Sequence, residues 1–258
     1  MPTSASVVSI GDTELQSGVV LPDLKISHST FGTLNATRSN AILLPTFYGG
    51  KHSDYEPMIG VDKALDPSKY FIIVVDMMCN GLSSSPSNSA SPFSGSNFPK
   101  ITHWDNVHAQ QKMLKQEYGI ESLSLVSGFS MGGQQANHWA AIFPDRVERM
   151  ISWCGSAVTS PHNWVFLEGV KAGLVNDPTF AGGAYVDPPE AGIRAFARIW
   201  AGWGPSQAFY RNKLHVDLGQ ATAADHMSEF WEPNFLAFDA NDLLGMMHTW
   251  QVANIADN

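Results

Sequence analysis

The residues most capable of chemistry in this sequence form the pattern Gly-Phe-Ser-Met-Gly at positions 128–132. An apolar run ends at this G-x-S-x-G pattern, and apolar residues at helical spacing follow it directly. This context is typical of a nucleophile elbow, a strand that turns sharply into a helix with a serine at its tip. A serine hydroxyl is a weak nucleophile until a base, itself held by a third group, takes its proton. We therefore predict that Ser130 is a nucleophile, and we look for the base that activates it.

Backbone donors for an oxyanion are predicted at two places. The helix after Ser130 directs its first N–H groups toward the serine, where negative charge would develop. A second donor in such sites comes from the loop after an earlier strand. Here that loop is Thr46–His52, and its paired glycines permit a close approach of the backbone. Both segments could also be ordinary structural turns.

No base is evident among the histidines that follow Ser130. They are His138, His162, His215, His226 and His248. His138 lies about 12 Å along the axis of the predicted helix and should point away from the turn. The other four lie in helical or loop contexts with no strand before them, as do the later acids. Those acids are Asp217, Asp225, Asp239 and Asp242. We expect surface or packing roles for all of them, so the sequence predicts no catalytic acid or histidine in this chain.

Strands and helices alternate around Ser130. Strands are predicted at Ala41–Thr46, Tyr70–Met77, Ser122–Gly128 and Arg149–Gly155, and weaker ones at Val7–Ile10 and Asp23–Ser29. Their continuous hydrophobicity is typical of strands covered on both faces. Helices are predicted at Asp105–Gly119, with Asp105 as the cap, and at Gly132–Phe143. The alternation predicts a doubly wound α/β sheet.

The chain changes character after the last of these strands. Apolar residues recur at helical spacing, and no further convincing strand is visible. We predict a core over residues 1–158 that contains the elbow and a helical cap segment over residues 159–258. A Ser/Pro/Asn-rich stretch, Ser83–Pro99, predicts a long loop that is either functional or a disordered surface segment.

Composition and charge restrict the partners. The net charge of −9 argues against nucleic acid and anionic membranes. Cys79 and Cys154 predict two buried reduced thiols rather than a bridge. There is no signal-peptide pattern and no apolar run of about 18 residues, so we expect a soluble cytoplasmic protein. Metal-ligand spacings and phosphate-binding motifs are absent from the sequence, so no metal and no cofactor is expected, and the partners should be small molecules.

Three stretches resemble the homoserine O-acetyltransferase family of the α/β-hydrolases: Lys63–Asn88, Asp105–Ala136 and Asp177–Arg198. The resemblance implies an α/β-hydrolase-like sheet followed by a cap. It also implies ping-pong acyl transfer, in which the elbow serine takes an acyl group from acyl-CoA as co-substrate and passes it to a hydroxyl. By position, Ser130 is then the nucleophile, and the backbone N–H groups of Met131 and Tyr48 form the oxyanion hole.

Two departures from that family stand out. Its homoserine-acylating members carry a Thr-Tyr-Arg-Ser motif whose arginine should hold the substrate carboxylate, and Gly204 stands at the arginine position here. Arg198 and Arg211 are nearby in sequence but are expected on solvated helix faces. Family members also continue past the last residues of this chain, through two more strands and the loops that bear the acid and the histidine. This chain is then a fragment, a shortened product or an incompletely represented enzyme.

The predicted function is a serine-dependent acyltransferase or esterase that acts on a small acyl ester or thioester through an acyl-enzyme on Ser130. The alternative is a truncated relative without catalysis that only binds a ligand. The acyl donor, the acceptor, the choice between transfer and hydrolysis, and a homodimer all stay open at this point.

Overall fold

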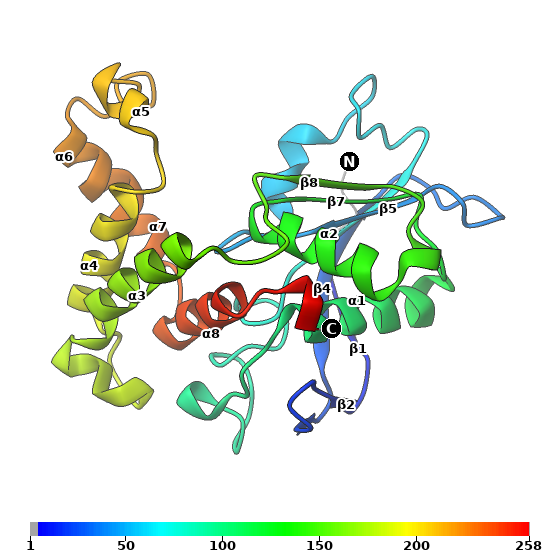
Figure 1. Ribbon diagram of the computed structural model, residues 1–258, viewed down its shortest axis with the longest axis horizontal. Coiled ribbons are helices and arrows are strands. Elements are labelled where there is room, and N and C mark those ends of the chain that lie inside the picture. The colour runs from blue at the N-terminus through cyan, green and yellow to red at the C-terminus, as the bar shows by residue number, and fades with distance from the viewer. Residues whose placement is uncertain (1–4, 258) are drawn as a thin grey trace. The chain divides into compact units, whose positions relative to one another are not determined.

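The computed structural model describes residues 5–257 (Figure 1). It divides into two compact units, residues 1–159 with 245–258 and residues 160–244, here called unit 1 and unit 2. The predicted division placed all of 159–258 in the cap segment. Residues 245–258 instead group with unit 1, where the Thr249 hydroxyl donates to the Ile101 carbonyl oxygen (2.8 Å) and Thr159 N donates to Ala253 O (2.9 Å).

Unit 1 contains a six-stranded sheet with the order β1-β4-β6-β5-β7-β8. The strands are β1 (Ser6–Ser9), β4 (Lys25–Phe31), β5 (Ala41–Pro45), β6 (Phe71–Val75), β7 (Leu125–Phe129) and β8 (Met150–Trp153). β5, β6, β7 and β8 pair in parallel, while β1 and β4 join the sheet antiparallel. A separate hairpin pairs β2 (Thr13–Glu14) with β3 (Val20–Leu21). The predicted α/β fold class and each predicted strand are confirmed.

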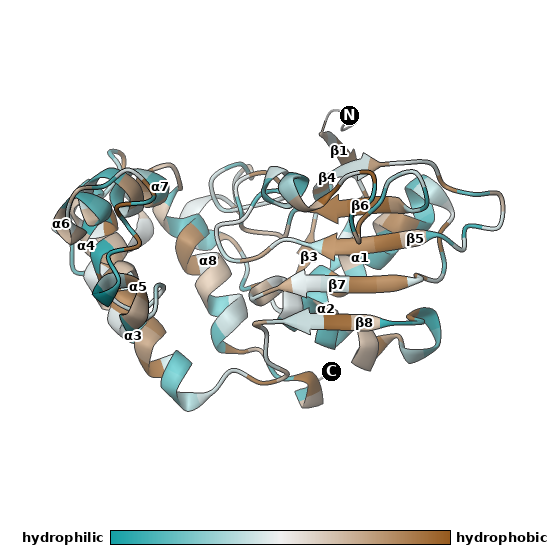
Figure 2. Cartoon of the chain, turned by 90° about the horizontal axis from the view of Figure 1, so that it is seen from above, coloured by the Kyte–Doolittle hydropathy of each residue, from teal (hydrophilic) through white to brown (hydrophobic). Residues whose placement is uncertain are grey.

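The middle of the sheet forms the core of unit 1. Every residue of β5 and β6 is buried, and Figure 2 shows both strands in the apolar colour along much of their length. Helices α1 (His103–Tyr118) and α2 (Met131–Ile142) pack against each other, and α2 also contacts β7 and β8. Strands covered on both faces explain why the hydrophobic pattern is continuous rather than alternating.

The start of α1 differs from the prediction, which made Asp105 the cap. Thr102 is the N-cap, and its hydroxyl accepts a hydrogen bond from Asp105 N. Asp105 is the third helical residue, and its carboxylate accepts from Thr102 N (2.7 Å). The two residues therefore form a reciprocal capping box, which moves the helix start back toward His103. Gly119 ends the helix in a left-handed conformation (φ 62°), as predicted.

Short 3₁₀ helices interrupt the loops of unit 1. They are η1 (His52–Met58), η2 (Gly95–Asn97), η3 (Pro144–Arg146) and η6 (Ile255–Asp257). The predicted loop at Ser83–Pro99 contains only η2 as regular structure. Cys79 is buried, as predicted, but Cys154 is exposed, so the prediction of a buried thiol is wrong there. Cys154 follows the last residue of β8, an edge strand of the sheet, where nothing pairs on its outer side among the described residues.

The described residues of unit 2 form helices and loops without a strand, as predicted. The helices are α3 (Pro161–Val175), η4 (Pro178–Gly183), α4 (Glu190–Ala201), α5 (Gln207–Arg211), α6 (Ala223–Asp225), η5 (His226–Trp231) and α7 (Glu232–Leu236). Helix α8 (Ala240–Gln251) begins in unit 2 and ends in unit 1. Within residues 5–257, none of the helices has the length and the apolar character that crossing a membrane requires.

Candidate active site

Ser130 occupies a strained turn between β7 and α2. Its backbone angles are φ 52° and ψ −120°, a region that residues with a side chain rarely adopt. Such a conformation costs about 1–3 kcal/mol and persists only where the surroundings enforce it. Ser130 N donates to the Trp153 carbonyl oxygen at the end of β8 (3.0 Å), which ties the turn to the neighbouring strand. The side chain is half-buried at the tip of the turn. This is the geometry that the G-x-S-x-G pattern predicts.

Three glycines make this turn sterically feasible. A β-carbon on Gly128 would lie 2.1 Å from the carbonyl carbon of Gly132, and one on Gly132 would lie 2.4 Å from the oxygen of Pro45. A β-carbon on Gly133 would lie 2.7 Å from Ser152 Oγ. All three distances are below van der Waals contact. The first turn of α2 therefore packs directly against β7, β8 and the end of β5, and only glycine fits.

The loop that carries Tyr48 is fixed against the same helix. Thr46 Oγ1 accepts from Met77 N (2.9 Å), and the Thr46 carbonyl oxygen accepts from Gln135 Nε2 on α2 (2.8 Å). The Tyr55 hydroxyl donates to Pro45 O (3.1 Å) and accepts from Phe129 N (3.0 Å). These bonds connect the end of β5, η1 and the elbow.

The two candidate oxyanion donors are both buried residues near the elbow. Met131 follows Ser130 directly as the first residue of α2, and its side chain is buried. Tyr48 is buried as well, and its ring lies 5.9 Å from that of Trp250, centroid to centroid. Burial raises the pKa of Tyr48 well above its usual value, so its phenol stays neutral.

The later histidines contact other groups. His138 is buried on α2, where its Nδ1 lies 2.8 Å from the Gln134 carbonyl oxygen. In unit 2, His215 and His226 are buried among aromatic rings, and His162 is exposed at the start of α3. Among the described residues, no hydrogen bond joins the Ser130 hydroxyl to a histidine.

The later acids lie in unit 2. Asp225 Oδ2 accepts from Thr222 N at the start of α6, and Asp239 Oδ1 accepts from Asn241 N. Asp242 is buried on α8, and Asp217 is exposed. These two hydrogen bonds, from Thr222 N and Asn241 N, are local backbone contacts that cap turns and helix starts.

An acid–histidine pair lies upstream of Ser130, apart from the histidines that follow the serine. Asp76 follows β6 and is buried, and its Oδ2 lies 2.7 Å from Nδ1 of His52 at the start of η1. The hydrogen bond with Asp76 raises the pKa of His52 above its usual value. Asp76 lies near the end of the predicted strand Tyr70–Met77, and His52 ends the predicted loop Thr46–His52. A polar residue at each of these places was the only sign of the pair in the sequence. The structure gives neither of them a hydrogen bond to the Ser130 hydroxyl in the part of the chain that it describes.

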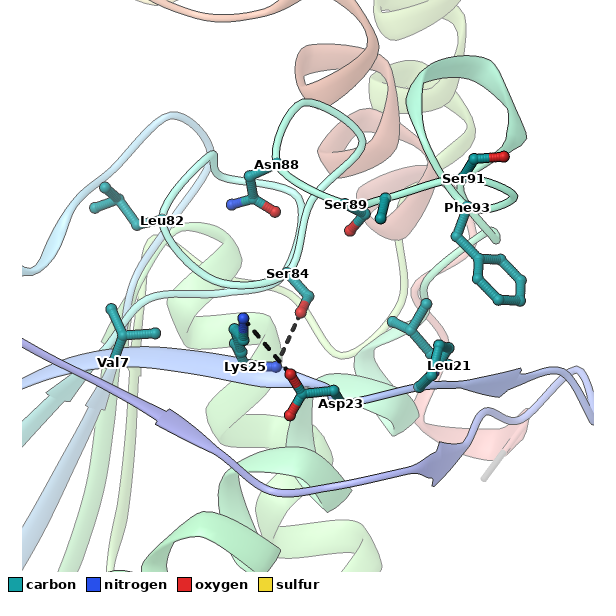
Figure 3. Close-up of a pocket in the computed structure, with 12 residues that line it drawn as sticks. Val7, Leu21, Asp23, Lys25, Leu82, Ser84, Asn88, Ser89, Ser91 and Phe93 are labelled. Atoms are coloured by element: carbon teal, nitrogen blue, oxygen red, sulfur yellow. Dashed lines mark hydrogen bonds and ion pairs between the residues drawn. The ribbon is translucent and has the colours of Figure 1, made fainter.

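A pocket of about 480 Å³ lies elsewhere in unit 1, between β4 and the Ser-rich loop (Figure 3). Its lining includes Asp23 and Lys25, an exposed ion pair with 3.5 Å between Nζ and Oδ2. Ser84 Oγ is already used, because it accepts from Lys25 N (2.9 Å). The lining contains no serine paired with a histidine, so this pocket does not compete with Ser130 as the candidate active site.

Gly204 of unit 2 stands where homoserine-acylating members of the resembled family carry a substrate-binding arginine. A β-carbon on Gly204 would lie 3.1 Å from the Trp231 ring and 3.3 Å from that of Trp200. Arg198 is held by the buried Glu232, with 2.6 Å between Nε and Oε1, and Arg194 binds the same carboxylate at 2.7 Å. Arg198 was expected on a solvated face; its side chain is 60% exposed but committed to Glu232. Two tryptophan rings thus lie close to the exposed Gly204, and Arg198 already has a carboxylate partner.

Comparison with known proteins identifies the family. A model described as alpha/beta hydrolase fold matches residues 42–190, which is more than half of the chain. This protein belongs to the alpha/beta hydrolase fold family. A probable esterase of Corynebacterium glutamicum is 40% identical over 252 residues, covering 96% of this chain and 72% of the relative. An ethyl acetate hydrolase of Pseudomonas veronii is 38% identical over 253 residues, covering 97% of this chain and 72% of the relative.

A solved structure supports the same family. The crystal structure of an acetylester hydrolase from Corynebacterium glutamicum superposes with a TM-score of 0.96 at 39% identity. The superposition covers 98% of this chain and 74% of the chain in the crystal structure. The described part of this chain therefore shares its fold with that acetylester hydrolase over nearly all of its length.

The resemblance to homoserine O-acetyltransferases is present but weaker. The enzyme of that name from Haemophilus influenzae is 31% identical over 239 residues, covering 86% of this chain and 64% of the relative. The esterases match at higher identity over more of the chain. The comparisons support a serine esterase-type hydrolase or acyltransferase, and the homoserine-acetylating type has no specific support.

Proposed function

We propose that this hydrolase is a serine esterase that cleaves small acetate-type esters through an acyl-enzyme on Ser130. The strained tip position of Ser130 between β7 and α2 carries the proposal, because its side chain makes no capping hydrogen bond to α2 and so has no local structural role as a cap. The esterase and ethyl acetate hydrolase relatives support an ester as the substrate class.

In the proposed reaction the Ser130 oxygen attacks the ester carbonyl carbon and loses its proton to a base. The N–H groups of Met131 and Tyr48 donate hydrogen bonds to the carbonyl oxygen as negative charge develops on it. Collapse of the intermediate breaks the bond to the alkoxy group, which leaves as an alcohol after protonation. Water then attacks the acyl-enzyme in the same way and releases the carboxylic acid and Ser130. We propose no cofactor for this reaction, small molecules as its only partners, and a cytoplasmic location.

A fluorophosphonate probe tests the nucleophile. In protein that contains the complete catalytic machinery, labelling should occur at Ser130, located by peptide mass spectrometry, and the substitution Ser130→Ala should abolish it. Ser156→Ala is the matched control, because Ser156 is a half-buried serine of unit 1 outside the elbow. Labelling that persists in Ser130→Ala would refute the proposal.

The base gives a second, kinetic test. Oxyanion donors and binding alone leave a residual acceleration of about 10³–10⁴ over water. Because no hydrogen bond joins the Ser130 hydroxyl to a histidine among the described residues, residues 1–258 by themselves should turn over p-nitrophenyl acetate far below the usual range of about 1–10³ s⁻¹. Turnover inside that range would mean that a histidine of this chain is the base, and His→Ala variants would identify it.

Acyl transfer to homoserine from acyl-CoA is the competing function, and two observations oppose it. Gly204 lies where an arginine was expected, and Glu232 occupies the guanidinium of Arg198. A substrate carboxylate would want an uncommitted guanidinium for a bidentate contact. Homoserine should therefore divert no more acyl-enzyme from water than a simple alcohol does, which product analysis measures. A saturable preference for homoserine would favour the transferase.

A further inference from the structure

Asp76 gathers hydrogen-bond donors from three separate segments of unit 1. Its side chain has no exposed surface. It accepts from Ser27 Oγ on β4 (2.8 Å), from Asn80 Nδ2 (3.2 Å), and from both the backbone N (2.9 Å) and Nδ1 (2.7 Å) of His52. A buried carboxylate with this many donors is held in position, because displacing it would leave several polar groups without hydrogen-bond partners.

Two of these donors belong to groups that hold the Tyr48 loop. His52 ends the loop and begins η1, so its two bonds to Asp76 fix the loop at one end. Asn80 Nδ2 also donates to the Gly50 carbonyl oxygen (3.3 Å), two residues after Tyr48. We call His52, Asp76 and Asn80 the loop clamp. It acts on the segment that directly follows the proposed oxyanion donor.

The opposite end of the loop is anchored on the elbow itself. Thr46 is bound by Gln135 of α2, and Tyr55 joins Pro45 to Phe129, the residue before Ser130. Tyr48 therefore lies on a short segment with both ends tied, one to the elbow and one to Asp76. Oxyanion donors contribute to rate only when they are held at hydrogen-bond distance from the developing charge.

We propose that His52 is a positioning residue of the Ser130 reaction, which acts through its bond to Asp76 to hold the Tyr48 N–H in place. The inference rests on the proposed function of Ser130. It assigns the role to Nδ1, the nitrogen that contacts Asp76. Nε2 would be the reacting nitrogen if His52 were the base instead. The two nitrogens can be separated by substitution.

His52→Asn and His52→Leu form the matched pair of variants. An asparagine amide nitrogen can replace Nδ1 toward Asp76 but has nothing at the place of Nε2, while leucine replaces neither. Hydrogen exchange of the peptide covering residues 46–52, measured by mass spectrometry, reports the loop without requiring activity. Exchange should speed up about tenfold or more in His52→Leu and stay within about threefold of wild type in His52→Asn.

The rate of fluorophosphonate labelling at Ser130 gives the functional readout. In His52→Leu the maximal rate of labelling should fall about 10- to 100-fold with an unchanged half-saturating probe concentration, since a displaced oxyanion donor affects the transition state. His52→Asn should restore most of the rate. Urea midpoints of both variants verify that they are folded.

The outcomes separate the ideas. Equal loss of rate in both variants would overturn the proposal and make Nε2 the functional nitrogen. Unchanged exchange in His52→Leu would also overturn it. A wild-type chain that is not labelled at Ser130 would contradict the proposed function, and the exchange measurement would then decide alone on the loop clamp.

Discussion

Two histidine sites in unit 1 differ in the partner that the fold supplies. His52 contacts the buried carboxylate of Asp76, and this contact raises its pKa. His103, at the start of α1, is buried beside His138, with 4.8 Å between the ring centroids. Its Nε2 lies 3.2 Å from Gln134 Oε1, and its Nδ1 has no hydrogen-bond partner among residues 5–257.

The two sites therefore shift the pKa of a histidine in opposite directions. Burial lowers the pKa of His103 to about 3, and the nearby His138 adds to the lowering. The charged groups that act on His52 are acidic: Asp76, which follows β6, and Asp54 and Glu56 of η1. Burial alone keeps a histidine neutral, whereas a carboxylate at hydrogen-bond distance favours the cation. The buried, neutral arrangement of His103 serves packing, and the carboxylate-bound arrangement of His52 can serve a functional site.

The largest effect should come from removing the carboxylate. Asp76→Ala removes the acceptor of four hydrogen bonds, and the lost side chain has no exposed surface. We expect a loss of about 3–5 kcal/mol in the free energy of unfolding, measured by urea denaturation. The conservative change at the other site, His103→Gln, keeps a group that can bond to Gln134 and should cost about 1 kcal/mol or less. Similar losses of unfolding free energy in Asp76→Ala and His103→Gln would show that the two histidine sites do not differ in this way.

An intermediate effect should appear in acid. The folded pKa of His103 is below the unfolded value, so the unfolded chain binds more protons as the pH falls below about 6.5. The contribution of neutral His103 is complete above that pH and decreases toward about pH 3, by as much as about 1.4 kcal/mol per pH unit. Urea midpoints between pH 7 and 4.5 should fall more steeply for wild type than for His103→Gln. Parallel slopes would contradict the burial of a neutral ring.

The smallest effect should appear above neutral pH. There the free energy of unfolding should decrease as the pH rises, whereas the His103 effect decreases it as the pH falls. The folded pKa of His52 is raised, so its charged contact with Asp76 contributes fully below about pH 6.5 and is lost as the pH rises through the folded pKa. Because His52 is partly exposed, we expect less than about 1 kcal/mol in all. His52→Asn should lack this slope between pH 6 and 9, and a slope that remains would assign it to another group.

Local patterns in the sequence were sufficient for the fold and for one side of the site. Continuous apolar runs gave the positions of the sheet strands, because strands buried on both faces cannot alternate. The glycines around Ser130 gave the turn, since only glycine tolerates the 2.1 Å and 2.4 Å approaches found at Gly128 and Gly132. Asp105 shows the limit: two neighbouring capping residues share the helix start, and only the hydrogen bonds tell which is the cap.

Contacts between distant segments were beyond the sequence. His52 and Asp76 are separated by 24 positions, and no local pattern pairs them. The parallel register of β5 and β6 places Pro45 beside Val75, so the residues that follow both strands meet at one edge of the sheet. In the same way, Glu232 meets Arg198 across 34 positions and pairs with it, while the Arg198 side chain stays 60% exposed. The sequence by itself determined the elements and the strained serine, because these depend on neighbours along the chain. The tertiary structure alone decided which charges meet, because that depends on which strand ends and helix faces the fold brings together.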